Sequence, residues 1–163
     1  MTELSNGEGS SIEAPIPGRD VLILRHLVLD LNGTLALDGW ILDGIPERIA
    51  ALRAHLRVHV LTAGSHGHVE ECAWVLGLQP IPISRGTEKR DHVRALGPHN
   101  VVAMGNGAND ALMLEEAALA IAVLGPEGLS PDALRVADVV VADPCAGLDL
   151  LLHPIRLAAT LRP

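Results

Sequence analysis

Six short aliphatic runs, separated by helical patterns, constrain the fold of this chain most strongly. The runs are HLVLD (26–30), VHVLT (58–62), PIPIS (80–84), NVVAM (100–104), LAIAV (119–123) and DVVVA (138–142). Most of them lack the alternation of polar and apolar residues of a half-exposed strand, which is typical of strands buried on both faces of a parallel sheet. The pattern predicts an α/β fold with an open, doubly wound, Rossmann-like and mostly parallel sheet and right-handed crossovers.

The segments between these runs carry helical spacing with start and stop signals. Thr87 is an expected N-cap, and Ser130, followed by Pro131, is a clear start signal. Pro154 is expected to interrupt the last helical stretch. The expected helices span residues 45–56, 69–76, 87–96, about 109–118, a segment from 131 onward, and 148–161.

The beginning of the chain differs in composition from the rest. Residues 1–11 are polar and rich in Gly and Ser, which predicts a disordered tail before a single domain over residues 12–163. Two short extended pieces flank a Pro-Gly turn within residues 12–24, and we expect a β-hairpin there.

Composition excludes several classes of protein. The chain has 163 residues and a formal net charge of −8, with no Phe or Tyr and two Trp, so its core is aliphatic and neither a polyanion-binding surface nor a base-stacking platform is expected. Its two Cys lack a CxxC partner, which argues against a zinc site or a disulfide framework. No apolar run reaches 18 residues and no leader pattern is present. We therefore expect a cytoplasmic protein without a membrane or nucleic-acid partner.

Polar residues follow the apolar runs where a parallel sheet binds its ligands. Asp30 ends the first run, Thr62 ends the second, and GNGAND (105–110) follows NVVAM. Since ligands of doubly wound sheets bind at the carboxyl ends of the strands, these three groups converge on one edge. Each has a simpler interpretation: Asn32-Gly33 is a strong hairpin signal, Thr62 suits a helix N-cap, and GNGAND suits a loop that starts a helix. The single lysine of the chain, Lys89, would likewise be an ordinary solvated charge on a helix.

The order of these residues resembles the four motifs of the haloacid dehalogenase (HAD) superfamily. DLNGT (30–34) is similar to the first motif, Thr62 to the second, Lys89 to the third, and GNGANDALML (105–114) to the fourth. The resemblance extends from about residue 27 to 143. It is closest to small members without a large cap domain, the soluble P-type-ATPase-like proteins.

The resemblance implies phosphoryl transfer through an aspartyl-phosphate. Asp30 would be the nucleophile, and Asn32, Thr62 and Lys89 would complete the catalytic set. The phosphate would be held by Gly33, Thr34, Thr62, Ala63 and Lys89. Lys89 would also keep Asp30 ionised by lowering its pKa.

The resemblance further implies a Mg²⁺ cofactor held by oxygen ligands. The expected ligands are the Asp30 carboxylate, the Asn32 carbonyl oxygen, Asn106 and Asp110. Asn109 would support these residues.

Two residues depart from the family pattern. Asn32 stands where the family has the Asp that exchanges protons with the leaving group and with water, and loss of such a group typically costs about 10²- to 10⁴-fold in rate. Asn106 replaces another Asp and lowers the charge of the metal site. Hydrolysis is then expected to be slow or restricted to substrates with good leaving groups. His66 and His68 are candidates to replace the base, although a pair of polar loop residues is the simpler interpretation.

The segment TLALDGWILDG (34–44) is expected to form a small flap with Trp40 exposed. An open site of this kind fits a large phosphate-bearing substrate or a homo-oligomer in which a neighbouring subunit covers the site. Two other hypotheses remain open: a catalytically silent phosphate-binding or regulatory module, and an unrelated response-regulator-like or nucleotide-binding α/β protein.

Overall fold

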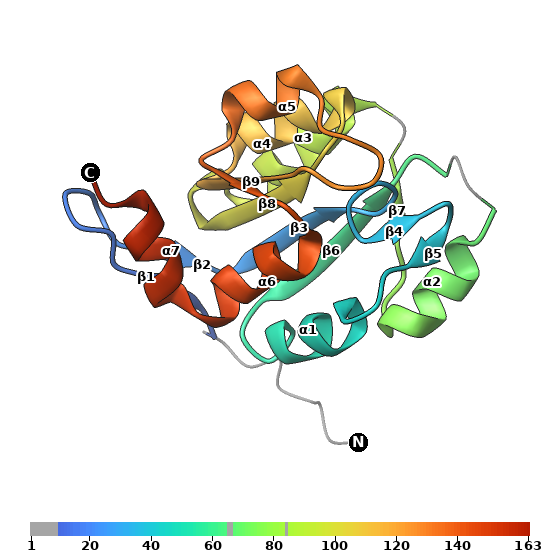
Figure 1. The fold of residues 1–163 in the computed structure, drawn as a ribbon, viewed down its shortest axis with the longest axis horizontal. Helices are drawn as coiled ribbons and strands as arrows, with labels where there is room; N and C mark the ends of the chain where they lie inside the picture. Colours follow the sequence, from blue (N-terminus) through green and yellow to red (C-terminus); the bar gives the residue numbers. More distant parts are fainter. Residues whose placement is uncertain (1–9, 65–66, 84) are drawn as a thin grey trace.

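The centre of the protein is a six-stranded parallel sheet, seen in a computed structural model that describes residues 10–64, 67–83 and 85–163 (Figure 1). In spatial order its strands are β10 (Val139–Val141), β9 (Leu119–Val123), β8 (Val101–Gly105), β3 (His26–Asp30), β6 (Arg57–Thr62) and β7 (Ile81–Pro82). All neighbouring pairs are parallel. The α/β prediction is confirmed, and each predicted aliphatic run overlaps a strand of this sheet.

Helices cover both faces of the sheet. One layer consists of α1 (Ile45–Leu52), α2 (Val69–Leu76), α6 (Pro144–Leu152) and α7 (Pro154–Leu161). The other consists of α3 (Gly86–Leu96), α4 (Ala111–Glu116) and α5 (Pro131–Val136). The layers lie below and above the sheet in Figure 1. The two cores between sheet and helices are built mainly from Leu, Ile, Val and Ala, as expected for a chain without Phe or Tyr.

Two antiparallel hairpins lie outside the main sheet. β1 (Ile12–Ala14) pairs with β2 (Leu22–Leu24), which confirms the predicted hairpin, although it forms a sheet of its own. β4 (Ala36–Leu37) pairs with β5 (Trp40–Ile41) within the predicted flap. Its turn is Asp38-Gly39, where both φ angles are positive, as tight hairpin turns require.

Helix starts were predicted unevenly. Ser130 caps α5 as predicted, because its Oγ accepts a hydrogen bond from the Asp132 amide. The prediction of Thr87 as an N-cap is wrong, since α3 begins at Gly86 and Arg85 precedes it without a side-chain cap. A Cβ on Gly86 would lie 2.9 Å from the Asn109 carbonyl oxygen, so the close packing of these two segments favours glycine at this position. Pro154 separates α6 from α7 as predicted.

Two short 3₁₀ helices flank strand β8 in the chain. They are the 3₁₀ turns η1 (Pro98–Asn100) and η2 (Ala108–Asp110).

No helix in the described part of the chain is long and apolar enough to cross a membrane. The predicted tail lies outside the described residues up to residue 9, whereas the Ser10 hydroxyl donates a hydrogen bond to the Ala54 carbonyl oxygen at 3.1 Å.

Candidate functional site

Lys89 joins two carboxylates at the carboxyl edge of the sheet. Its Nζ lies 2.8 Å from Asp30 Oδ1 and 2.7 Å from Asp110 Oδ1. The lysine side chain is 0% exposed and both aspartates are buried. Lys89 comes from α3, Asp30 from the end of β3, and Asp110 from η2. The fold therefore brings together three charged residues that are far apart in the sequence, which rules out the alternative of a solvated lysine.

The NGT sequence after Asp30 forms a tight turn at the end of a parallel strand. Leu31 O accepts hydrogen bonds from the amides of Leu35 and Ala36, and Gly33 N donates to Ala36 O at 2.8 Å. Gly33 has φ +79°, and a Cβ there would collide with the Asn106 side chain and with Glu127 Oε2. Asn32-Gly33 is therefore not the turn of the nearby hairpin. The glycine is needed because two loops meet at this point.

Thr34 continues this turn into the buried site. Its hydroxyl donates at 3.4 Å to Asp30 Oδ2, and it lies 3.3 Å from Asn106 Oδ1. The loop after β8 is fixed from the other side, because Asp110 Oδ2 accepts hydrogen bonds from the amides of Asn106 and Gly107 at 3.0 and 2.9 Å. All three hydrogen bonds to the Asp110 carboxylate, from Lys89 Nζ and from these two amides, are therefore made within the protein.

Thr62 ends the neighbouring strand β6 and is also buried. Its Oγ1 accepts a hydrogen bond from Gly64 N at 3.1 Å, and Ala63 between them is exposed. This local bond holds the chain after β6 in a turn that faces the end of β3. Thr62 precedes α2 by several residues, so it is not the cap of that helix.

A polar cavity of about 180 Å³ opens at this edge. It is lined by Asp30, Asn32, Ala63, Asn106, Gly107, Asn109 and Glu127. Asn32 Oδ1 is buried in the described structure without a hydrogen-bond partner, an arrangement that a ligand can relieve. The cavity therefore gathers residues from three of the four motif-like segments.

Glu127 was not expected at this site. It lies in the Gly-Pro-Glu-Gly loop after β9 and is exposed, and it lines the cavity next to Gly33. A usable signal was present in the sequence, because this loop also follows the carboxyl end of a parallel strand. It adds a carboxylate to a site in which Asn32 and Asn106 have only amides.

The buried charges affect one another strongly. Burial, followed by the negative charge of Asp110, raises the pKa of Asp30 to about 7, and the opposing effects of Lys89 and Thr34 are smaller. Lys89 lowers the pKa of Asp30, as predicted, but burial and Asp110 outweigh this effect. Burial disfavours the charged form of Lys89, but Asp110 and Asp30 outweigh it and its pKa is raised. One ammonium cannot neutralise two carboxylates, and the excess negative charge favours a proton on Asp30.

Of the two histidines after Thr62, His68 lies within the described residues and His66 lies outside them. The ring of His68 lies 4.3 Å from that of Trp40, measured between centroids, and its Nδ1 is 3.7 Å from Glu71. Trp40 is 58% exposed, as predicted. In the described structure, neither the β4–β5 hairpin nor His68 lines the polar cavity.

Solved structures show the same arrangement of strands and helices. A HAD superfamily (subfamily III A) chain from Legionella pneumophila is 18% identical, with a TM-score of 0.63 over 85% of this chain and 87% of that one. The 3-deoxy-D-manno-octulosonate 8-phosphate phosphatase of Moraxella catarrhalis, solved with magnesium, phosphate and its sugar, is 19% identical, with a TM-score of 0.62 over 85% and 94%. The fold is that of the HAD superfamily.

A third similar structure is a zinc-transporting PIB-type ATPase in its E2·Pi state. It is 27% identical with a TM-score of 0.60, and the match covers 74% of this chain but 20% of that much longer one. The likeness is therefore to one part of the transporter, consistent with the resemblance to soluble P-type-ATPase-like proteins.

Two curated proteins of Methanocaldococcus jannaschii are similar in sequence. Uncharacterized protein MJ0073 is 47% identical over 62 residues, which are 38% of this chain and 67% of that protein. Uncharacterized protein MJ0072 is 43% identical over 37 residues, which are 23% of this chain and 84% of that protein. The chain belongs to the same family as these two archaeal proteins. No family model matches it.

Proposed function

We propose that this chain is a Mg²⁺-dependent phosphohydrolase or phosphotransferase that forms an aspartyl-phosphate on Asp30. The observation that carries this proposal is the fully buried Lys89 between Asp110 and Asp30, the second of which lines a polar cavity. Burying a lysine and two carboxylates is costly, and perturbed buried charges in a cleft are typical of functional sites. The HAD fold of the neighbouring structures, one of them solved with magnesium and phosphate, supports the same reaction class.

The donor set at the cavity fits a magnesium ion. Asp30, Asn32 and Asn106 line the cavity, and the side-chain oxygens of Asp30 and Asn106 with the backbone carbonyl of Asn32 would hold the ion. Mg²⁺ prefers such oxygen ligands together with water. Asp110 is the exception among the predicted ligands, because its oxygens already bind Lys89 and two backbone amides. We therefore assign Asp110 the role of holding Lys89 and the β8 loop. A bound Mg²⁺ would neutralise charge on the phosphate and favour the ionised form of Asp30.

The protein's own groups account for the first step. A carboxylate oxygen of Asp30 attacks phosphorus, and the bond from phosphorus to the leaving oxygen breaks. Lys89 stabilises the charged form of Asp30, and we assign the Ala63 amide and the Thr62 hydroxyl to the phosphoryl oxygens. The predicted amides of Gly33 and Thr34 already donate to the carbonyl oxygens of Ala36 and Leu31. Asn109 lines the cavity, and we assign it a supporting role there.

Glu127 is the group that we assign to proton exchange. Asn32 cannot carry a proton between the leaving group and water, whereas the Glu127 carboxyl lines the same cavity and reaches Gly33. In the first step it gives its proton to the leaving oxygen. In the second it takes a proton from the water that attacks the phosphorus of the aspartyl-phosphate, which releases phosphate and restores Asp30.

Hydrolysis of acetyl phosphate and p-nitrophenyl phosphate, with and without Mg²⁺, tests these assignments. We expect Mg²⁺-dependent turnover that is lost in Asp30→Asn. Glu127→Gln should lower the rate by about 10²-fold or more, with the greater loss on the substrate that has the poorer leaving group. Adding Asn32→Asp to Glu127→Gln should restore much of the rate, because it returns a proton-exchanging carboxylate to the site.

The matched control is Glu13→Gln, which removes a carboxylate from the distant strand β1 and should leave the rate unchanged. Turnover that survives Asp30→Asn would contradict the proposed function. Turnover that requires Asp30 but is unaffected by Glu127→Gln would contradict only the role of Glu127.

The second candidate is a phosphate-binding module without turnover. It is favoured by Asn32 and Asn106, which place two amides where the HAD pattern has carboxylates. Calorimetry with phosphate ligands would then show binding that survives Asp30→Asn, with no product formed by the wild-type chain.

A further inference from the structure

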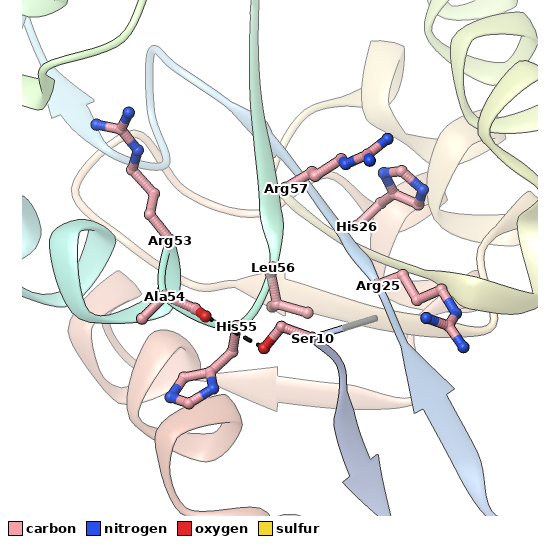
Figure 2. Close-up of a pocket in the computed structure, with 8 residues that line it drawn as sticks. All are labelled: Ser10, Arg25, His26, Arg53, Ala54, His55, Leu56 and Arg57. Carbon is pink, nitrogen blue, oxygen red and sulfur yellow. Dashed lines mark hydrogen bonds between the residues drawn. The ribbon is translucent and has the colours of Figure 1, made fainter. Parts of the chain in front are cut away.

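A second cavity lies at the opposite ends of the central strands, far from the site described above. It has a volume of about 400 Å³ and is shown in Figure 2. We refer to it as the basic cavity, and its lining residues are Ser10, Arg25, His26, Arg53, Ala54, His55, Leu56 and Arg57. Three arginines and two histidines line it, and none of its described lining residues is acidic. This composition is unusual in a chain with a net charge of −8.

The parallel pairing of β3 with β6 places the basic residues side by side. His26 is the register partner of Arg57, and Arg57 N donates a hydrogen bond to Arg25 O at 2.9 Å. In Figure 2 the side chains of Arg25, His26 and Arg57 extend to the same side of the two strands. Arg53 extends to the other side, where its guanidinium donates to Gly77 O at 2.8 Å.

The positive charge in this cavity is not neutralised by the described residues. Elsewhere in the protein, arginines such as Arg48 and Arg94 pair with carboxylates, at 2.7 and 3.0 Å. Within the described ranges, Arg25 and Arg57 form no such pair. Burial and then the positive charges of Arg57 and Arg25 lower the pKa of His26, so a further positive charge is disfavoured beside them. An anion bound here would relieve this repulsion.

We propose that the basic cavity binds a small oxyanion that carries several negative charges. Guanidinium groups match phosphate and carboxylate oxygens through paired hydrogen bonds, and Arg25 and Arg57 are exposed and available to make them. The volume is sufficient for such an anion. The described lining contains no aromatic ring other than imidazoles, so the ligand is a compact polyphosphate or polycarboxylate and not a nucleotide held by base stacking. This inference does not depend on the chemistry proposed for Asp30.

Titration of the isotope-labelled full chain with pyrophosphate, and separately with citrate, tests the proposal by NMR. The buffer contains a chelator and no Mg²⁺, and sodium chloride at matched ionic strength is the third arm. We expect the amide signals of His26 and Arg57 to shift and saturate with pyrophosphate, citrate or both. The difference between these two arms distinguishes phosphate from carboxylate as the preferred group. Signals of Gly107 and Ala63 report separately on the other site.

Variants then locate the binding. The double variant Arg25→Gln, Arg57→Gln should raise the dissociation constant for the anion by about tenfold or more, because the hydrogen bonds from the charged guanidinium groups are lost. The matched control Arg135→Gln removes an exposed arginine paired with Asp132 on α5 and should change nothing. Three results would overturn the proposal: shifts that do not saturate or that chloride reproduces, shifts confined to Gly107 and Ala63, or an unchanged affinity in the folded double variant. The wild-type titration decides the matter by itself if the double variant does not fold.

Discussion

The two ends of strands β3 and β6 carry charge in opposite ways. At the carboxyl ends, Lys89 is completely buried and is held within 2.8 Å by each of two carboxylates. At the amino ends, Arg25 and Arg57 are exposed, and among the described residues no carboxylate pairs with them. Burial makes the first set of charges interdependent, because an unpaired ion in a low dielectric is very costly. Solvent screens the second set, so each cation there contributes little to stability and remains free to bind a ligand.

The largest expected difference between the two ends is in stability. Lys89→Met leaves Asp30 and Asp110 buried without their shared cation, and the free energy of unfolding should fall by about 3–5 kcal/mol. Urea unfolding of wild type and variant measures this. Adding Asp110→Asn to Lys89→Met should recover part of the loss, because it removes one of the two unpaired charges. A loss below about 1 kcal/mol for Lys89→Met would show that the triad is not buried as described.

Gly33→Ala tests the tight turn at the carboxyl edge. The glycine has φ +79°, and the added Cβ would press against the Asn106 side chain and Glu127. We expect a loss of more than about 1 kcal/mol in unfolding free energy and weaker phosphate binding, since the loops must separate. Gly128→Ala is the control for backbone strain alone: it also has positive φ, at +80°, but its Cβ would meet nothing within 4 Å. An equal effect of both substitutions on phosphate binding would contradict the importance of the close approach.

The histidines near the amino ends of β3 and β6 predict that the free energy of unfolding falls in acid. His26 Nδ1 lies 3.2 Å from His59 Nε2, and the His59 and His92 rings are 5.2 Å apart. Burial and then the neighbouring histidines and Arg57 lower the pKa of His59 to about 4. The pKa of His59 is thus lower in the folded chain than the value of 6.5 expected when it is unfolded. The contribution of His59 to stability is therefore fully present above pH 6.5 and is lost as the pH falls from 6.5 towards 4, because the unfolded chain takes up the proton first.

Unfolding free energies measured between pH 7 and 4.5 test whether stability falls with pH in this way. Solvent reaches part of the His59 ring, so we expect a decrease of about 1 kcal/mol from this residue, which His59→Gln should remove from the pH dependence. His99→Gln, at an exposed histidine on η1, is the control. Identical pH profiles for wild type and His59→Gln would rule out this contribution.

The smallest expected effect is that of Arg57→Gln on stability. The side chain is exposed and forms no ion pair with a described residue, so the free energy of unfolding should change by no more than about 0.5 kcal/mol. The same denaturation experiment that shows a large loss for Lys89→Met measures it. A loss of several kcal/mol would mean that Arg57 is a structural residue, and the contrast between the two ends would fail.

The sequence predicted the carboxyl edge better than the amino edge. Asp30, Thr62 and the loop after NVVAM were placed correctly because the carboxyl ends of parallel strands share one edge of the sheet. Lys89 reached the same edge through a helix, which the order of motifs indicated. The sequence shows Arg25-His26 and Arg57-Val58 where two of the aliphatic runs begin. The exposure of these arginines and the contacts among the histidines depend on strand register and packing, which the sequence alone does not give. Glu127 was missed because its loop belongs to none of the recognised motifs.

The central claim is that Asp30 accepts a phosphoryl group, and peptide mass spectrometry tests it most directly. The chain is incubated with acetyl phosphate and Mg²⁺ and quenched in acid. We expect a single phosphoryl adduct on the peptide containing Asp30, accumulating further in Glu127→Gln, where proton exchange with water is impaired, and absent in Asp30→Asn. No adduct in either the wild type or Glu127→Gln, or the same adduct in Asp30→Asn, would contradict the account.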